Sequence, residues 1–250
     1  MYNKKPTDRG YTQYPRQVSE YMDKVANWNT RARSYGNFFC KLLDERGVKR
    51  VLDMSTGTGF DTIMLLKNGF DVVSLDGSVH MLKKAKENAR RHGVSKDFLP
   101  VAADWRQIGN TFRVKFQAAL CLGNSFCHLR DVERRHVIKQ VRGLLEPTGV
   151  FIVDYRNFDS IINGNNPVYG RSGYYSGEGV KVTFTSEQGR VIEKFDFVDG
   201  GSFVLKFHPV PLKVAINELE DNGFTVTVYS DFKKGPNEDA SFYQLVGKAS

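Results

Sequence analysis

Residues 51–67 constrain the fold of this chain more than any other segment. A short apolar run reaches Asp53, breaks into a turn that contains Gly57 and Gly59, and continues with apolar residues at helical spacing. A strand, a tight glycine turn and a helix present backbone N–H groups to a nucleotide-like ligand at the edge of an open α/β sheet. The segment therefore predicts a nucleotide site, and its surroundings must indicate which nucleotide.

Apolar strands and helical patterns alternate along most of the chain. We expect a helical region over residues 11–46, ended by Gly47, and strands over 50–53, 71–76, 98–102, 116–122 and 150–154. Helices are expected over 81–91, 132–145 and 211–222, a turn at 147–149, and further strands over 225–229 and 242–248. Buried strands that alternate with helices predict an α/β fold: a seven-stranded, mostly parallel sheet covered on both faces.

The pattern changes between residues 157 and 209. This region is rich in Gly, Asn and Ser, and it holds alternating stretches over 180–185, 191–198 and 202–208 that are joined by turn sequences. Such stretches predict a small antiparallel β lobe. We therefore expect a disordered lead over 1–10, a main domain over 11–156 and 210–250, and an inserted lobe over 157–209.

Composition limits the location and the partners. No apolar stretch is long enough to cross a bilayer, no secretory signal is evident, and three scattered cysteines suggest buried, reduced thiols in the cytoplasm. The net charge is +8 (36 minus 28), but acidic residues intersperse the basic ones, as in residues 83–91. This pattern favours a solvated helix face over a nucleic-acid surface. We expect no membrane partner, no nucleic-acid partner and no metal.

Asp53 distinguishes this turn from a dinucleotide site. A dinucleotide fingerprint usually has a third glycine after the strand, which is missing here, and tolerates little negative charge beside a pyrophosphate. A ligand with an ammonium group and no phosphate would favour a carboxylate at this position. A strand–helix turn that simply needs two glycines is the alternative.

Further polar residues follow the next two strands. Asp76 lies 17 positions beyond Gly59 (76 minus 59) and suits a carboxylate that accepts both ribose hydroxyls, although it could also cap the following helix. Asp104 could accept from an adenine amino group, and the indole of Trp105 could stack on the adenine ring. Trp105 could equally be a core residue. Because all three follow neighbouring parallel strands, they should share one crevice. An adenosine joined to a charged amino acid fits this set, which predicts S-adenosylmethionine.

Three motifs carry a family resemblance. Residues 121–129 read C-L-G-N-S-F-C-H-L, residues 153–161 read V-D-Y-R-N-F-D-S-I, and residues 230–233 read S-D-F-K. In these motifs the chain resembles the glycine N-methyltransferases and the glycine/sarcosine N-methyltransferases of betaine synthesis, from about residue 28 to 162 and more loosely to the C-terminus. The resemblance implies a Rossmann-like class I methyltransferase fold.

The resemblance also implies roles for single residues. Arg31 matches the arginine that pairs with the methionine carboxylate of the cofactor, and the expected cofactor-binding set is Trp28, Arg31, Asp53, Ser55, Gly57, Gly59, Asp76, Gly77, Asp104, Trp105 and Leu122. For the acceptor, Arg156 offers a planar fork that binds a carboxylate, and the amide of Asn124 could accept from the amine. Asn124 could instead be a turn residue and helix cap, and Arg156 a surface arginine.

Tyrosines complete the expected acceptor site. Tyr175 matches a substrate tyrosine of the family, although it could also be lobe core. The segment that folds over the site in this family contains three tyrosines here, Tyr11, Tyr14 and Tyr21. Of these we expect Tyr14 to belong to the acceptor site. Where mammalian members have a tyrosine in an L-D-Y stretch, this chain has Phe195-Asp196-Phe197, and the family's later Tyr-Tyr-Pro is here Phe207-His208-Pro209. These departures weaken the transfer of roles within the lobe.

The expected activity is methylation of glycine to sarcosine and of sarcosine to dimethylglycine. Methyl transfer from a sulfonium to an amine is an in-line displacement that needs no metal and leaves S-adenosylhomocysteine. Three alternatives stay open: a methyltransferase of this fold acting on another small amine or on nucleic acid, a non-catalytic cofactor-binding module, and a nicotinamide-dependent oxidoreductase. The sequence does not indicate the number of methyl groups added or the oligomeric state.

Overall fold

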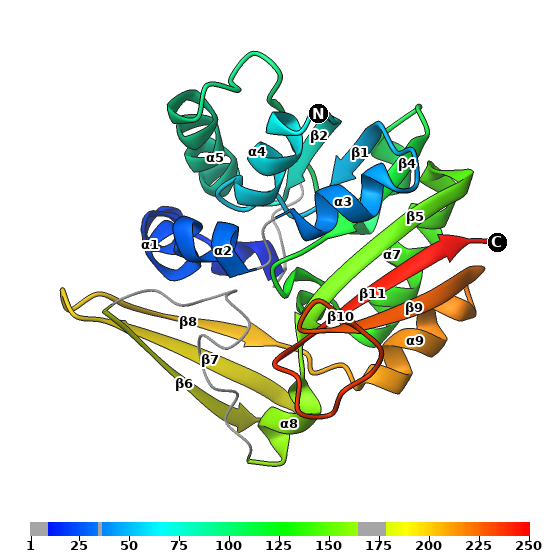
Figure 1. Cartoon of the computed structure of the whole chain (residues 1–250). Coiled ribbons are helices and arrows are strands. Elements are labelled where there is room, and N and C mark those ends of the chain that lie inside the picture. Colours follow the sequence, from blue (N-terminus) through cyan, green and yellow to red (C-terminus); the bar gives the residue numbers. More distant parts are fainter. Residues whose placement is uncertain (1–9, 35–36, 165–178) are drawn as a thin grey trace.

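The computed structural model describes residues 10–34, 37–164 and 179–250. It shows a large twisted sheet flanked by helices and a separate small sheet that extends from one end of it (Figure 1). Within the described ranges, no helix is both long and apolar enough to cross a membrane.

The large sheet has the strand order β10-β9-β11-β5-β4-β1-β2-β3. Strands β1 (Arg50–Asp53), β2 (Asp71–Asp76), β3 (Leu99–Ala102), β4 (Phe116–Cys121) and β5 (Leu145–Arg156) run parallel. Strand β11 (Phe242–Ala249) is antiparallel to both β5 and β9 (Phe224–Ser230). The mostly parallel sheet is therefore confirmed, and the carboxyl ends of its five parallel strands meet at one edge.

Two details of the sheet differ from the prediction. An eighth strand, β10 (Lys233–Lys234), follows a turn in which Asp231 and Phe232 both have positive φ, and two residues are too few to show a strand pattern. Strand β5 begins at Leu145, five residues before the predicted start, because the expected turn at 147–149 is an irregularity within the strand. Phe116 pairs with Leu145 and Ala118 already pairs with Val150.

Helices cover both faces of the sheet, as predicted. Helices α3 (Phe38–Asp44) and α4 (Phe60–Lys67) pack on one face together with Val150 and Ile152 of β5. Helix α5 (Val79–Arg91) packs beside α4 through Ala85 and Ala89. On the other face lie α6 (Ile108–Thr111), α7 (Asp131–Leu144) and α9 (Leu212–Glu220), against Phe151 and Val153 of β5. Because successive β5 residues face opposite layers, both faces must be apolar.

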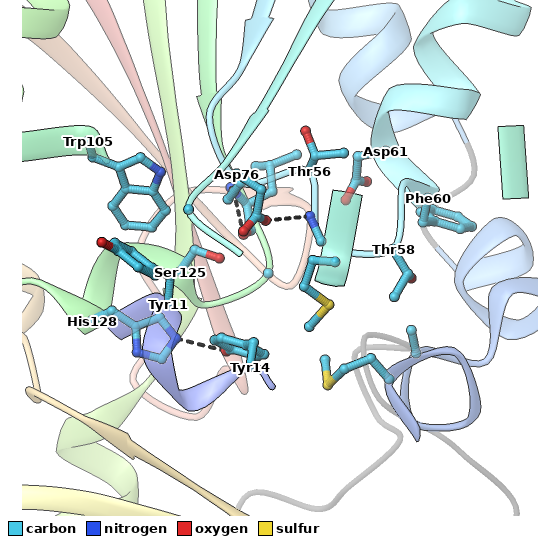
Figure 2. Close-up of a pocket in the computed structure, with 18 of the residues that line it drawn as sticks. Tyr11, Tyr14, Thr56, Thr58, Phe60, Asp61, Asp76, Trp105, Ser125 and His128 are labelled. Atoms are coloured by element: carbon cyan, nitrogen blue, oxygen red, sulfur yellow. Dashed lines mark hydrogen bonds between the residues drawn. The ribbon is translucent and has the colours of Figure 1, made fainter. Parts of the chain in front are cut away.

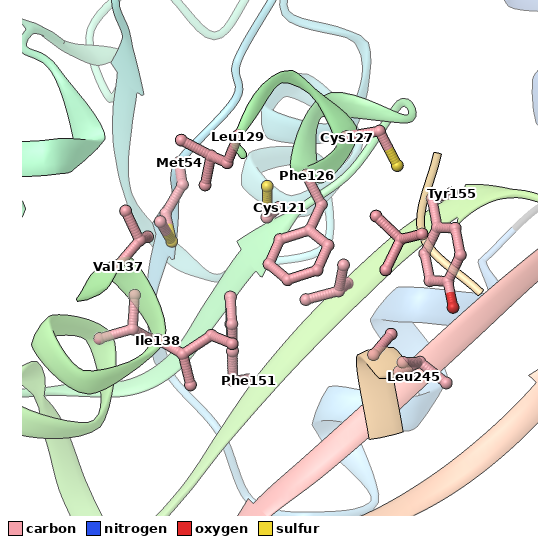
Figure 3. Packing of buried hydrophobic residues seen from close by; sticks show 14 of the residues in the cluster. Met54, Cys121, Phe126, Cys127, Leu129, Val137, Ile138, Phe151, Tyr155 and Leu245 are labelled. Carbon is pink, nitrogen blue, oxygen red and sulfur yellow. The ribbon is translucent and has the colours of Figure 1, made fainter. Parts of the chain in front are cut away.

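The core on the α7 face continues to the carboxyl ends of the strands. Figure 3 shows Met54, Cys121, Phe126, Phe151 and Tyr155 converging beneath the loop that follows β4. Each of these side chains is at most 1% exposed. All three cysteines are buried and unbridged, in agreement with their interpretation as small hydrophobic residues.

The predicted N-terminal helical region is divided into several helices. A 3₁₀ turn (Gly10–Gln13), α1 (Arg16–Ala26) and α2 (Trp28–Ser34) precede α3. Pro15 begins α1, and Asn27, with a φ of 30°, ends it in the left-handed region. Asn88 of α5 ties α1 to the glycine turn, since its amide donates to Asp23 at 3.1 Å and to the Thr58 carbonyl at 2.9 Å. The N-terminal helices are thereby held across the carboxyl edge of the sheet.

The small sheet consists of β6 (Val180–Glu187), β7 (Arg190–Phe197) and β8 (Ser202–Phe207), paired antiparallel in that order. The turn expected between the first two stretches lies at Gln188 and Gly189, whose φ values are 50° and 72°. A short helix, α8 (Phe158–Ile162), leads out of β5 toward this lobe. Phe195, Phe197 and Phe207 join the lobe to the core on the α7 face, so the lobe and the sheet share one apolar cluster.

Candidate active site

The glycine turn after β1 forms the floor of the candidate site. Gly57 and Gly59 have φ values of 54° and 95°, which side chains other than glycine adopt rarely. A Cβ atom on Gly59 would lie 3.1 Å from the Cβ of Ala85, so glycine also permits α5 to approach closely. The turn therefore needs both glycines for its backbone and one of them for helix packing.

Asp76 fixes the turn from the end of β2. Its carboxylate accepts from the Gly57 and Ser78 backbone N–H groups, each at 2.8 Å. Ser78, rather than Asp76, caps α5 by accepting from Met81 N. Burial raises the pKa of Asp76 to about 6, while the two N–H donors lower it. At neutral pH the side chain is thus mainly a carboxylate at the pocket wall, as a ribose acceptor requires.

A pocket of about 880 Å³ opens above this turn. It is lined from five directions: the glycine turn, the ends of β2 and β4, the segment after β3, α4 with α5, and the N-terminal helices. Figure 2 shows Trp105 and Phe60 at opposite ends of the pocket, with Asp76 between them. The predicted cofactor residues that line it are Arg31, Ser55, Gly57, Asp76, Gly77, Asp104, Trp105 and Leu122.

The segment after β3 forms the Trp105 end. The Trp105 indole N–H donates to the Met54 carbonyl at 2.6 Å, which fixes the ring while it lines the pocket. Asp104 accepts from the backbone and side chain of Arg106 at 3.0 and 3.1 Å. Arg106 also donates to Glu133 of α7 at 2.8 Å. This end offers an aromatic ring and a carboxylate, which suits an adenine.

The opposite end holds an ion pair between Arg31 and Asp61, both of which line the pocket. Arg31 of α2 is 6% exposed, donates to Asp61 at 3.0 Å and lies over the Phe60 ring at 4.4 Å. Its guanidinium is therefore held by neighbours on α4 while it lines the pocket. A carboxylate at one end of a ligand would find its counter-charge here.

The N-terminal segment forms the roof. A Cβ atom on Gly77 would clash with Cβ, Cγ and Cδ1 of Tyr11, so glycine at this position lets the ring pack on the backbone after β2. Tyr14 hydrogen-bonds His128 at 2.8 Å (Figure 2), and Gln13 bonds Lys206 of β8 through both its amide atoms at 2.6 and 3.1 Å. Burial lowers the pKa of His128 to about 3, so this ring is neutral at physiological pH.

Three residues of the expected cofactor set do not line the pocket. Asp53 is 1% exposed and lies beneath the turn, where it accepts from Thr62 Oγ1 at 2.5 Å and from Ser55 N at 3.1 Å. The direct contact with a cofactor ammonium that we expected is therefore not supported. Gly59 acts through the packing described above. Trp28 packs outside the pocket, against Phe60 and His92 at ring distances of 5.4 and 4.8 Å.

Of the predicted acceptor residues, Tyr14 lines the pocket, whereas Asn124 and Arg156 lie behind its wall. Together with Asp154 and Glu193, which were not predicted, Asn124 and Arg156 form a group that we call the acceptor corner. Asn124, between the lining residues Gly123 and Ser125, has a φ of 63° and is 1% exposed. Its N–H donates to Asp154 at 3.1 Å, and its Oδ1 accepts from the Arg156 N–H at 3.0 Å. Arg156 Nη2 donates to Glu193 of the lobe at 2.7 Å. The corner therefore joins β4, β5 and β7.

The structure adds to the expected role of Asn124. The oxygen that we expect to accept from the amine already accepts from the Arg156 backbone N–H and has one further lone pair. The Nδ2 of Asn124 is buried and has no partner in the described part of the chain. An amide donor of this kind suits a carboxylate rather than an amine. Arg156 is 3% exposed, not a surface arginine, and Tyr175 lies outside the described residues.

Sequence reasoning missed part of the lining. Thr56, Thr58, Gly123, Ser125 and Arg106 are sequence neighbours of predicted residues, so the motifs themselves could have indicated them. Phe60 and Asp61 start the helix after the turn. Met22, Ala26 and Met81 carry no sequence signal, since they reach the pocket only through helix packing. Glu193 was also missed, because nothing local links it to Arg156.

The lining fits S-adenosylmethionine. Trp105, Asp76 and Arg31 offer partners for the adenine, the ribose and the amino-acid carboxylate, in that order along the pocket. Thr56 Oγ1 is buried and has no partner in the described residues, although Thr56 lines the pocket. An unpartnered buried hydroxyl at a pocket wall is satisfied most simply by a ligand. Among the described residues, no cluster of three His, Cys, Asp or Glu side chains can hold a metal ion.

Comparisons with known proteins agree with the site. The model of a methyltransferase domain matches residues 51–149. The fold resembles that of an S-adenosylmethionine-dependent methyltransferase from Clostridium acetobutylicum, with a TM-score of 0.74, 19% identity, and coverage of 94% of this chain and 98% of that one. The chain thus has the class I, Rossmann-like methyltransferase fold, with S-adenosylmethionine as the methyl donor.

Curated relatives are closer in sequence. The glycine/sarcosine N-methyltransferase of Aphanothece halophytica is 38% identical over 97% of this chain and 92% of its own length. That of Parasynechococcus marenigrum is 36% identical over 97% and 86%. The human glycine N-methyltransferase is 33% identical over 65% of this chain and 59% of its own length. With its motifs, its fold and these relatives in agreement, the chain belongs to the glycine/sarcosine N-methyltransferase family.

Proposed function

We propose that this protein methylates the amine of glycine to form sarcosine, and the amine of sarcosine to form dimethylglycine. The observation that carries the proposal is the acceptor corner, where a buried guanidinium and a buried amide donor adjoin the wall of the cofactor pocket. Two donor groups of this type match the carboxylate of a small amino acid. The named relatives act on glycine and sarcosine, which supports the same acceptors here.

Bound S-adenosylmethionine supplies an electrophilic methyl group. The protein's task is then orientation: Arg156 and Asn124 hold the acceptor carboxylate, while Asp76, Trp105 and Arg31 hold the donor. Orientation of two bound reactants supplies up to roughly 7–11 kcal/mol of a reaction barrier. The acceptor amine must lose a proton, and we assign no base, since both His128 ring nitrogens already have partners, Nε2 in Tyr14 and Nδ1 in Gln13.

The domain boundaries, the location and the partners of the protein are also proposed. We propose that residues 157–209 act as a substrate lobe on a main domain formed by 11–156 and 210–250, with residues 1–10 as a lead. We also propose a cytoplasmic location and small amino acids as the partners, rather than nucleic acid or a membrane.

Product analysis tests the activity. The purified protein is incubated with S-adenosylmethionine and, in turn, with glycine, sarcosine, dimethylglycine and RNA, and the products are identified by mass spectrometry. We expect sarcosine from glycine, dimethylglycine from sarcosine, and no product from dimethylglycine or RNA. Methylated RNA without any sarcosine would overturn the proposal, and so would cofactor binding without turnover of any amine.

A further inference from the structure

Glu193 lies at a position that the strand pattern reserves for apolar residues. On β7, Val191, Glu193, Phe195 and Phe197 share the buried face, and Glu193 is 2% exposed. A buried carboxylate is costly unless it is paired and hydrogen-bonded. A local violation of this kind is expected chiefly at functional sites.

The partner of Glu193 is the residue to which we assign the acceptor carboxylate. The Arg156–Glu193 pair is 2.7 Å long, both side chains are 3% exposed, and the guanidinium lies near the rings of Phe184 and Phe242 at 5.2 and 4.8 Å. Replacing such a pair by apolar residues is often neutral or stabilising, so the pair is weakly explained by stability alone. Its placement at the acceptor suggests a role in recognition.

The four named side chains of the acceptor corner include two carboxylates and one guanidinium. Glu193 contacts the guanidinium of Arg156 directly, whereas the fully buried Asp154 is joined through Asn124 to the backbone N–H of Arg156. A ligand that brings a second carboxylate to this guanidinium without a positive charge is repelled by Glu193, because buried charges interact strongly at short range.

We propose that Glu193 selects acceptors that carry their own positive charge, and so favours zwitterionic amino acids over simple carboxylate anions. The inference rests on the proposed assignment of Arg156 to the acceptor carboxylate. In an α-amino acid a single carbon separates the nitrogen from the carboxylate, so an ammonium group necessarily enters the field of Glu193 when the carboxylate meets Arg156. Acetate offers the same carboxylate and no ammonium.

Calorimetry on enzyme saturated with S-adenosylhomocysteine tests this without turnover. Glycine and acetate are titrated into the wild type, Glu193→Gln, Glu193→Asp and a control, Glu187→Gln, whose exposed carboxylate lies on the neighbouring strand. The measured quantity is the ratio of the acetate Kd to the glycine Kd. We expect this ratio to fall about tenfold in Glu193→Gln, as loss of a contacting charge predicts, and to stay near the wild-type value in Glu193→Asp and Glu187→Gln.

A purely structural role gives a different result. If Glu193 only holds the lobe in place, Glu193→Gln weakens glycine and acetate together and the ratio does not change, which would overturn the inference. Should Glu193→Gln fail to fold, the ratio of the two Kd values in the wild type still tests the inference. Acetate binding as tightly as glycine would overturn it. Absence of sarcosine formation by the wild type would instead contradict the proposed function, since the binding ratio needs no turnover.

Discussion

The cofactor pocket and the acceptor corner recognise their ligands in different ways. The pocket is open, with about 880 Å³ of empty space that includes open solvent, and it is walled largely by turn backbone and by residues at strand ends. Its carboxylates and Arg106 are partly exposed, whereas Arg31 is buried. The corner is a closed set of side chains at most 3% exposed, tied to one another across three strands. A preformed cavity can accept its ligand without rearranging charge, whereas each charge in the corner depends on a partner. Changes in the corner should therefore affect stability and acceptor binding, and changes in the pocket mainly cofactor binding.

Arg156→Ala should have the largest effect. It removes the guanidinium that we assign to the carboxylate of the methyl-accepting substrate. It also leaves Glu193 buried without its partner, which costs about 3–5 kcal/mol of stability. We expect kcat/KM for glycine to fall by at least about 100-fold, with a lower Tm, while cofactor affinity changes little. Steady-state kinetics and thermal denaturation measure both effects. Lys181→Ala, on the exposed side of β6, is the control; unchanged glycine kinetics in Arg156→Ala would refute its assignment.

Asp76→Ala should affect the pocket alone. It removes the acceptor for Gly57 N and Ser78 N, and with it the proposed ribose contact. A lost buried acceptor costs about 1–3 kcal/mol, so we expect S-adenosylhomocysteine to bind roughly 10–100-fold more weakly by calorimetry. Asp71→Ala removes a carboxylate from the far end of the same strand, where it forms only an exposed pair with Arg50, and should leave the affinity unchanged. Equal weakening by both variants would contradict the role of Asp76.

Gly77→Ala should have a smaller effect on the pocket. The added methyl group displaces the Tyr11 ring from the roof without straining the backbone, because Gly77 does not have a positive φ. We expect a loss of cofactor affinity below about tenfold and a small change in Tm, since overpacking against a movable ring is relieved locally. Gly143→Ala on α7, where a Cβ meets no atom within 4 Å, is the matched control. An unchanged affinity would mean that Tyr11 does not cover the ligand.

Asp53→Asn should change cofactor affinity least, because Asp53 does not line the pocket. Burial raises its pKa from 3.8 to about 7, so the folded state holds a proton that the unfolded state has already lost between these values. Stability of the wild type therefore falls as pH rises through this range, and the variant lacks this loss. Thermal denaturation should show that the Tm of Asp53→Asn, relative to that of the wild type, is higher at pH 8 than at pH 5. A relative Tm that is higher at pH 5 would contradict the raised pKa of Asp53.

The same contrast explains what the sequence could predict. Asp76, Trp105 and the two glycines follow strands within one continuous stretch, so their meeting at one sheet edge follows from the order of parallel strands. Asn124 and Arg156 required motif resemblance, because an asparagine in a turn or an arginine after a strand has ordinary alternatives. The partner of Arg156 could not be predicted, since Glu193 comes from the lobe and is separated from it by 37 positions.

Fold prediction shows the same limit. The parallel strands were located nearly to the residue, because buried apolar runs between turns define them. The start of β5 was misplaced because Pro147 and Gly149 suggest a turn and only the pairing with β4 continues the strand. The role of Asp53 was misjudged for a related reason. Its position at the end of β1 does not reveal that Thr62, in the first turn of α4, donates a hydrogen bond to it.

Crossed titrations of Asp76→Ala and Arg156→Lys test the separation of the two regions most directly. Arg156→Lys keeps the charge beside Glu193 but loses the planar fork. S-adenosylhomocysteine is titrated into each variant, and glycine into each variant saturated with it. We expect Asp76→Ala to weaken the binding of S-adenosylhomocysteine only and Arg156→Lys to weaken the binding of glycine only, each by about tenfold or more. Weakening of both ligands by both variants would show instead that the pocket and the corner form one site.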